Sequence, residues 1–219
     1  FSMLYNHTEY VLQAYERCSP ATFDLCISEA DHTIEIFTLV ADPMTFFDKP
    51  IAVLTGPSCL SNGDITAHKL SDHPTLKYFG KSICSSASFS AAVENNFGWN
   101  LNYSATNVQA KSEPDVWLNR QEFPIDFPVW FNADDVAAGL DPVVKTAREW
   151  IEQTSYIHGV TLDRHFSNSG SFQIRGNVNN PNNHLLDAKA ILRNTDGTIT
   201  ETIQLDDLTM DKQFWEKEF

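Results

Sequence analysis

A serine and an aspartate, three positions apart, follow an apolar run and a sharp turn. The run Ile51 to Leu54 leads into Thr55-Gly56-Pro57, and Ser61 then precedes a segment with helical spacing of apolar residues. Backbone N–H groups at the start of a helix lack intrahelical partners, and the helix dipole favours negative charge there. A serine in this position could therefore act as a nucleophile beside donors that stabilise a developing oxyanion.

A structural interpretation of the same serine stands beside the catalytic one. Serine is a favoured N-cap, and Ser61 with Asp64 resembles a capping box in which Asp replaces Glu. Capping serines vastly outnumber nucleophiles, so the residues alone favour the cap, and both interpretations remain open at this point.

A strand–helix–strand unit would position this segment. We predict a buried parallel strand over 51–54, a helix over 60–70 that ends at His73-Pro74, and a short strand over 76–79. Such a unit is typical of α/β architecture.

Further elements are expected on either side. We predict a short amphipathic helix over 9–16, a strand over 34–40, and a β-rich, aromatic stretch over 98–131. A helix over 141–151 is indicated by Asp141 as a candidate cap, followed by a proline in the first turn.

The pattern changes beyond Ser155, where short alternating segments are separated by Asn-Pro and Asp-Gly turns. We therefore place a boundary near 154–158, between an α/β domain over 1–154 and a small antiparallel, sandwich-like and incomplete β domain over 155–219. The Asn194–Gly197 turn predicts a hairpin in the second domain. This domain is interpreted as a spacer or packing module, with substrate or surface attachment as the alternative.

Composition restricts the function classes. The chain has 29 acidic and 15 basic residues and a formal net charge of −14, which argues against nucleic-acid partners and against an anionic membrane surface. No apolar run is long enough to cross a bilayer, and no targeting segment is evident at the start of the sequence. We expect a soluble globular protein with no membrane insertion.

The four cysteines do not have metal-ligand spacing. Disulfides, including one that closes a short loop, and buried free thiols are equally open interpretations, and no metal or cofactor is expected. The cysteines are Cys18, Cys26, Cys59 and Cys84.

Three segments, in order and together covering roughly residues 48–152, resemble peptidase family S41, the tail-specific or C-terminal processing peptidases. The first is the run from Pro50 to Asp64, with its Thr-Gly-Pro-x-Cys-x-Ser-x-Gly-Asp ending. The second runs from His73-Pro74 to Phe79-Gly80-Lys81. The third runs from Val129-Trp130-Phe131 through the helix that ends near Ile151.

The resemblance implies a core similar to the ClpP/crotonase fold, and cleavage of peptide bonds through a serine acyl-enzyme. Ser61 is then the nucleophile, and the N–H of Asn62 is one oxyanion donor. Asp64 matches a position that is often acidic in the family, and the resemblance implies that it orients the site.

Two branches of the family place the general base differently. In the Ser–Lys branch a lysine lies 25 residues after the nucleophile, where this chain has Ser86, and Lys81 nearby is interpreted as a solvated turn residue. The tricorn-like and retinoid-binding-protein-like branch uses an upstream histidine with a downstream acid, for which Glu122 is a candidate. His68 and His73, at either end of the helix after Ser61, are interpreted as structural residues.

The family's glycine-rich strand-turn, which supplies the second oxyanion donor, is not recognisable. We expect it to lie upstream together with the histidine base, so that this chain is a fragment whose activity needs the missing part. The leading hypothesis is a secreted or cell-envelope serine endopeptidase with peptide or protein substrates. The alternatives are a pseudopeptidase that binds peptides or protein tails without cleavage and, last, a crotonase-like acyl-CoA enzyme, for which no basic cluster near Ser61 would meet the CoA phosphates.

Overall fold

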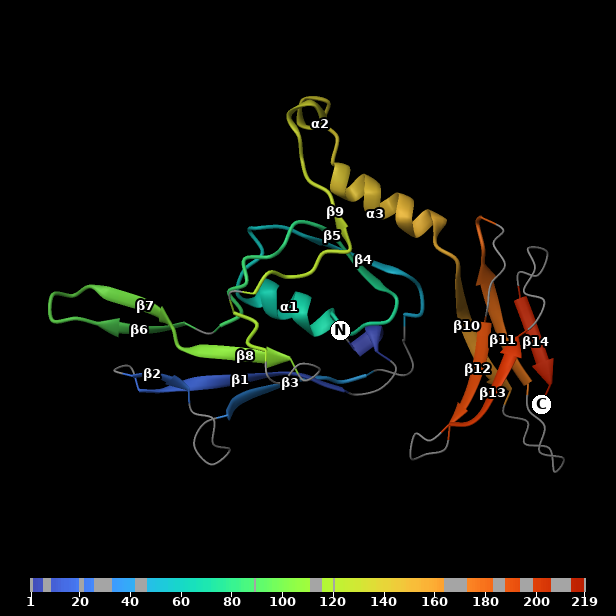
Figure 1. The fold of residues 1–219 in the computed structure, drawn as a ribbon, viewed down its shortest axis with the longest axis horizontal. Coiled ribbons are helices and arrows are strands. Elements are labelled where there is room, and N and C mark those ends of the chain that lie inside the picture. The colour runs from blue at the N-terminus through green and yellow to red at the C-terminus, as the bar shows by residue number, and fades with distance from the viewer. Residues whose placement is uncertain are drawn as a thin grey trace. The chain divides into compact units, whose positions relative to one another are not determined.

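The chain divides into two compact units, which are described separately (Figure 1). The first comprises residues 1–47 and 51–147, and the second 48–50 and 148–219. This division falls inside a helix, whereas the sequence places the boundary just after it. The computed structural model describes residues 2–5, 9–19, 22–25, 33–41, 47–88, 90–110, 116–119, 121–163, 173–182, 188–193, 199–205 and 214–218.

An antiparallel sheet in the first unit is organised around β1 (Glu9–Ser19). This strand pairs with β2 (Thr22–Leu25), β3 (Thr33–Leu39) and β8 (Thr106–Ala110). The strand predicted over 34–40 is confirmed as β3. A 3-10 turn, η1 (Ser2–Leu4), precedes the sheet.

The helix predicted over 9–16 is wrong, because this segment is β1. Leu12 and Ala14 are fully buried, while Gln13 and Tyr15 are half-buried, which is the two-residue period of a strand. Pairing with β3 and β8 on its two sides outweighs the helical spacing of a few local residues.

A second, parallel sheet contains β4 (Ile51–Thr55), β5 (Leu76–Gly80) and β9 (Phe127–Pro128), in that order. Helix α1 (Asn62–Leu70) connects β4 to β5, so the predicted strand–helix–strand unit is confirmed. β4 is less buried than expected: its first three residues are half-buried and Leu54 is 48% exposed.

The core lies where α1 meets both sheets. Figure 1 shows α1 between the sheet of β1, β3 and β8 and the strands β4 and β5. One cluster of buried side chains joins these elements, and it includes Leu12, Leu39, Ile65, Leu70, Leu76, Tyr78, Val108 and Phe123.

Four further elements follow, of which the last, α3, extends beyond the first unit. β6 (Ser90–Glu94) and β7 (Asn100–Ser104) form a separate antiparallel hairpin. α2 (Ala133–Ala137) is followed by α3 (Pro142–Gln153), whose predicted cap is confirmed because Asp141 Oδ1 accepts the N–H groups of Val143 and Val144 at 2.9 and 3.0 Å.

The described strands of the second unit all pair antiparallel, as expected for this segment. β10 (Tyr156–Asp163), β11 (Gln173–Asn179) and β14 (Phe214–Glu218) form one sheet, and β12 (Ala188–Arg193) pairs with β13 (Ile199–Leu205). The predicted turn at 194–197 lies outside the described residues, but the strands on either side of it do pair. No helix in the described part of the chain is long and apolar enough to span a membrane.

Candidate active site

Ser61 has a strained backbone at the end of the turn between β4 and α1. Its φ of 57° and ψ of −114° lie in a region that residues other than glycine seldom occupy. Strained residues of this kind persist only where the surrounding structure holds them, and they concentrate at functional sites. A serine on a sharp, strained turn between a strand and a helix is the arrangement that presents a nucleophile in several hydrolases.

The capping-box interpretation is wrong. The Ser61 side chain makes no capping hydrogen bond, although the residue occupies the N-cap position of α1. The fully buried carboxylate of Asp64 does not accept a hydrogen bond from the backbone at the start of the helix, as a capping box would require. Its Oδ1 accepts the N–H of Ser85 and its Oδ2 accepts the N–H of Ser86, each at 3.0 Å.

The N–H of Asn62 is a candidate oxyanion donor. Asn62 is the first residue of α1, and among the described residues its N–H has no hydrogen-bond partner. The neighbouring turn is closed, because Gly63 N–H donates to the carbonyl of Leu60 and Ile65 N–H to that of Ser61, both at 3.0 Å. A donor next to the serine therefore remains available at the positive end of the helix.

The loop that follows β5 runs beside this turn. The N–H of Lys81 donates to the carbonyl of Thr55 at 3.3 Å, and the Thr55 hydroxyl donates to the carbonyl of Lys81 at 3.0 Å. Further along, the N–H of Cys84 donates to the carbonyl of Cys59 at 2.9 Å. With the two bonds to Asp64, these contacts fix the loop against the segment that carries Ser61.

Ser86 and Lys81 differ in how they relate to the site. Ser86 is held beside the first turn of α1 through its N–H, while its side chain is exposed. Lys81 Nζ lies 5.2 Å from the ring centroid of Trp130, in a cation–π contact. Neither side chain is hydrogen-bonded to Ser61 in the described structure.

Glu122 belongs to a segment that is tied to the same loop. The Ser85 hydroxyl donates to the carbonyl of Gln121, and the N–H of Phe123 donates to Ser82 Oγ at 2.8 Å. The exposed Glu122 lines a cavity of about 460 Å³. Ser61 does not line this cavity, and among the described residues no hydrogen bond joins the side chains of Ser61 and Glu122.

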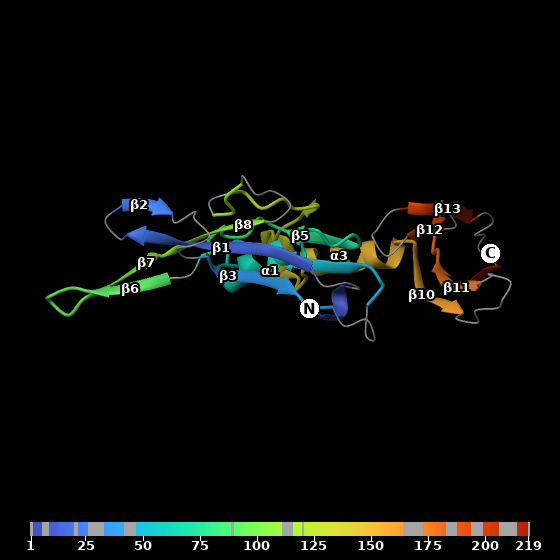
Figure 2. The same cartoon turned by 90° about the horizontal axis from the view of Figure 1, so that it is seen from below.

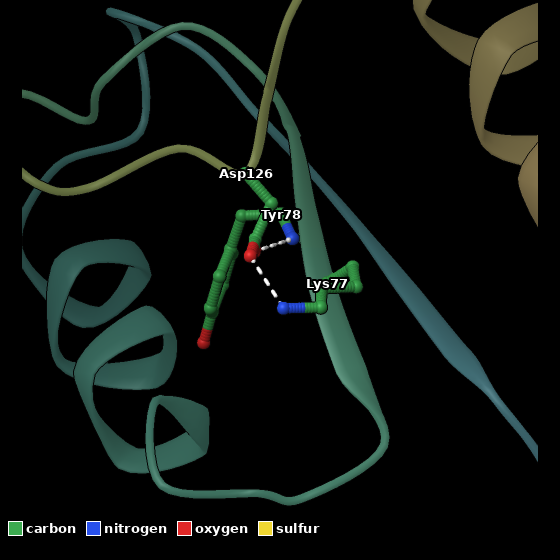
Figure 3. Close-up of polar contacts among 3 residues, drawn as sticks. All are labelled: Lys77, Tyr78 and Asp126. Atoms are coloured by element: carbon green, nitrogen blue, oxygen red, sulfur yellow. Dashed lines mark hydrogen bonds and ion pairs between the residues drawn. The ribbon is translucent and has the colours of Figure 1, made fainter.

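Asp126 was not predicted as a site residue, and it attaches the Glu122 segment to β5 (Figure 3). One carboxylate oxygen accepts Lys77 Nζ at 2.7 Å, and the other accepts the N–H of Tyr78 at 2.8 Å. An aspartate after a stretch without periodicity gives no signal of such a pairing, which depends on a strand about 50 residues earlier.

Ser85 is the other residue that sequence reasoning missed. Its φ is 58°, and its N–H and hydroxyl bond to opposite neighbours, Asp64 and Gln121. It therefore links the first turn of α1 to the Glu122 segment, and a positive φ at a serine cannot be read from the sequence.

His68, in the last turn of α1, and His73, just beyond the end of this helix, have contacts that fit structural roles. His73 is buried, its Nδ1 accepts the N–H of Thr75 at 3.3 Å, and its Nε2 donates to the carbonyl of Leu4 at 2.7 Å. His68 packs edge-on against Phe123 with ring centroids 4.9 Å apart, and burial lowers its pKa to about 4. In the described part of the chain, neither ring is bonded to Ser61.

Cys59 and Cys84 are free thiols. Burial raises the pKa of the Cys59 thiol, and the nearby charge of Asp64 raises it further. The side chain of Cys18 and the whole of Cys26 lie outside the described residues. Among the described residues, no group of three or more His, Cys, Asp or Glu side chains could hold a metal ion.

Two solved structures resemble the fold of this chain. A putative peptidase from Parabacteroides merdae has a TM-score of 0.58 and 15% identity, with 68% of this chain and 45% of that chain covered. Mature CPAF complexed with lactacystin has a TM-score of 0.52 and 14% identity, with 70% of this chain and 41% of that chain covered. This chain thus spans less than half the length of either protein.

Neither a protein-family model nor a curated protein matches the sequence. At this level of identity, the two structures show that the chain has a mixed α/β, peptidase-like fold.

Proposed function

We propose that this chain is part of a serine endopeptidase in which Ser61 is the nucleophile. The observation that carries the proposal is the backbone of Ser61, with φ of 57° and ψ of −114°, combined with a side chain that makes no capping bond. A serine that acted only as an N-cap would have an unstrained, extended backbone, and its hydroxyl oxygen would accept an N–H group of the helix. The peptidase-like fold of two structural neighbours supports the same class of reaction.

The proposed reaction proceeds through an acyl-enzyme. A general base removes the Ser61 hydroxyl proton as Oγ attacks the carbonyl carbon of the peptide, and the N–H of Asn62 donates to the resulting oxyanion. The C–N bond then breaks, the base returns the proton to the leaving amine, and water hydrolyses the Ser61 ester.

We place the base on a histidine from a region outside this chain. The resemblance to the tricorn-like and retinoid-binding-protein-like branch, in which an upstream histidine is the base, supports this placement, and no hydrogen bond among the described residues joins Ser61 to a basic side chain. Glu122 is the proposed acid that orients the histidine, because its segment is bonded to the loop held by Asp64. Asp64 is a positioning residue, and Ser86 is part of the loop that it positions.

The finer identity that we propose is family S41, tail-specific peptidases, with a ClpP/crotonase-like core. The parallel β4–α1–β5 unit, with the serine at its turn, supports this assignment. Peptides or protein tails in an extracellular or cell-envelope compartment are the proposed substrates. The net charge of −14 favours cationic or neutral substrates over anionic ones.

Hydrolysis of an unfolded, dye-labelled casein by the full-length protein that contains these residues tests this function. We expect Ser61→Ala to lower kcat/KM by about 10³-fold or more, because the nucleophile is lost. Ser58→Ala changes an exposed serine of the same turn and should leave the rate unchanged. Retention of the full rate in Ser61→Ala would contradict the proposal.

The second candidate is a pseudopeptidase that binds peptides without cutting them. It is favoured by the same missing bond between Ser61 and a base among the described residues. The casein experiment separates the two, because a pseudopeptidase binds the substrate equally in the wild type and in Ser61→Ala and hydrolyses it in neither.

A further inference from the structure

The hairpin of β6 and β7, residues 90–104, has one apolar and one polar face; we call it the arm. In its register Val93 pairs with Leu101, while Ala92 pairs with Asn102. Because side chains alternate between the faces of a strand, these two pairs lie on opposite faces. Figures 1 and 2 both show the arm extending away from the other elements of the first unit.

Three apolar residues of the arm, Phe97, Trp99 and Leu101, are the most exposed large hydrophobic residues in the described structure. Phe97 is 85% exposed, Trp99 74%, Leu101 68% and Val93 48%. Large apolar side chains gathered on one exposed element mark an interaction surface more often than isolated ones do. A two-stranded hairpin is also marginally stable alone, so covering this face would stabilise it.

The tip of the arm is held in a defined shape. The Asn95 side-chain oxygen accepts the N–H groups of Phe97 and Trp99 at 2.9 and 3.0 Å, and Asn95 N–H donates to the carbonyl of Trp99 at 2.9 Å. Gly98 permits this turn with a φ of 76°. The two aromatic residues are thus presented by a braced loop, and less conformational entropy is lost when they are covered.

The arm differs in charge from the rest of the chain. Residues 90–104 contain one charged residue, Glu94, whereas the whole chain has a net charge of −14. Two copies of the chain, or the chain and an anionic lipid surface, repel each other over most of their area. Two arms can meet with little of this repulsion.

We propose that the arm is a self-association surface, and that its occupant is the arm of a second copy of this chain. Packing about a twofold axis brings the same apolar face together from both copies. Each aromatic residue can bury about 150–250 Å². Two arms then supply about 1,000 Å² in total, near the lower limit for a specific interface, so the dimer is reversible.

Sedimentation equilibrium over a wide range of protein concentration tests the proposal. The chain of residues 1–219 should show a reversible monomer–dimer equilibrium. The double variant Trp99→Ser/Leu101→Ser should raise the dissociation constant about tenfold or more, because central apolar contacts dominate small interfaces. Asn100→Ser/Asn102→Ser changes the same strand on the polar face and should leave the equilibrium unchanged.

Cross-linking locates the contact. In a Cys84→Ser background, Leu101→Cys should form an intermolecular disulfide in the presence of oxidised glutathione, since two copies of Leu101 lie near the twofold axis. Asn102→Cys should not. Circular dichroism of each variant establishes that it is folded, which is expected because the changed side chains are exposed.

Two results would overturn the proposal. One is a protein that stays monomeric at every concentration. If this monomer also sedimented with phosphatidylcholine vesicles, and the Trp99→Ser/Leu101→Ser variant did not, the arm would instead be a membrane-binding surface. The other is a dimer that the Trp99→Ser/Leu101→Ser variant leaves unchanged, which would place the interface elsewhere.

Discussion

His68 shows how a single residue on the site's helix is constrained by what packs against it. Its Nε2 is buried and has no hydrogen-bond partner in the described structure, and its ring lies edge-on against Phe123. Burial disfavours the charged form of the imidazole, so the pKa falls from 6.5 to about 4. The folded protein therefore contains a neutral His68 throughout the physiological pH range.

The lowered pKa predicts that acid destabilises the first unit. Below about pH 6.5 the unfolded chain takes up a proton at His68 that the folded chain does not accept until about pH 4. This residue therefore does not lower the free energy of unfolding well above pH 6.5, whereas at pH 5 it should lower that free energy by about 2 kcal/mol. In urea unfolding at several pH values, His68→Leu should remove this share of the pH dependence.

The comparison between the wild type and His68→Leu isolates the residue, because both proteins share every other titrating group. A difference in the free energy of unfolding that stays constant between pH 7 and pH 5 would show that His68 is accessible to protons in the folded state.

At Ser61, the sequence allowed the position of the residue to be predicted but not its chemistry. The apolar run and the Thr-Gly-Pro turn correctly placed Ser61 before a helix. The local pattern favoured a cap. It failed because the N–H groups that donate to Asp64 belong to Ser85 and Ser86, more than 20 residues later in the chain. A competition between local and distant hydrogen-bond partners cannot be decided from spacing alone.

At the scale of the elements, the position of the loop after β5 depends on one buried side chain, that of Asp64. Asp64 is fully buried and accepts two backbone N–H groups of this loop, while Ser85 in turn reaches the Glu122 segment. The carboxylate thus connects α1 to two segments that the candidate site needs.

Replacement of Asp64 should destabilise the first unit strongly. Asp64→Ala leaves two N–H groups without their partner, at a cost of about 2–4 kcal/mol. Asp64→Asn should cost less, since an amide oxygen can still accept one of them. Thermal unfolding checks both, with Asp72→Ala as the matched control, because Asp72 is exposed just beyond the same helix and should change stability by less than about 0.5 kcal/mol.

A stability of Asp64→Ala equal to that of the control would contradict the two hydrogen bonds. Equal effects of Asp64→Ala and Asp64→Asn would show instead that the charge, and not the pair of acceptors, is what the loop requires.

Element prediction succeeded where one pattern was available and failed where two competed. The 51–80 region has turn signals between a strand, a helix and a strand, and all three are confirmed. Residues 9–16 contain apolar residues that satisfy helical spacing, but Leu12 and Ala14 also satisfy strand alternation, and the neighbours β3 and β8 decide in favour of the strand. Their positions follow from the tertiary fold, which local periodicity does not contain.

At the scale of the whole molecule, the fold and the reaction rest on different kinds of support. The mixed α/β, peptidase-like fold follows from the two structural neighbours. The proposed serine mechanism rests on the geometry around Ser61 in a chain that spans less than half the length of those proteins. A fold supports many chemistries, so the nucleophile has to be tested directly.

Labelling with a fluorophosphonate, followed by peptide mass spectrometry, is the most direct test of Ser61. The probe reacts with an activated serine hydroxyl and not with an ordinary one. We predict an adduct at Ser61 in the full-length protein that contains these residues, none at Ser58 or Ser85, and none in the Ser61→Ala variant. A folded full-length protein in which Ser61 stays unlabelled, or in which another serine carries the adduct, would contradict the account.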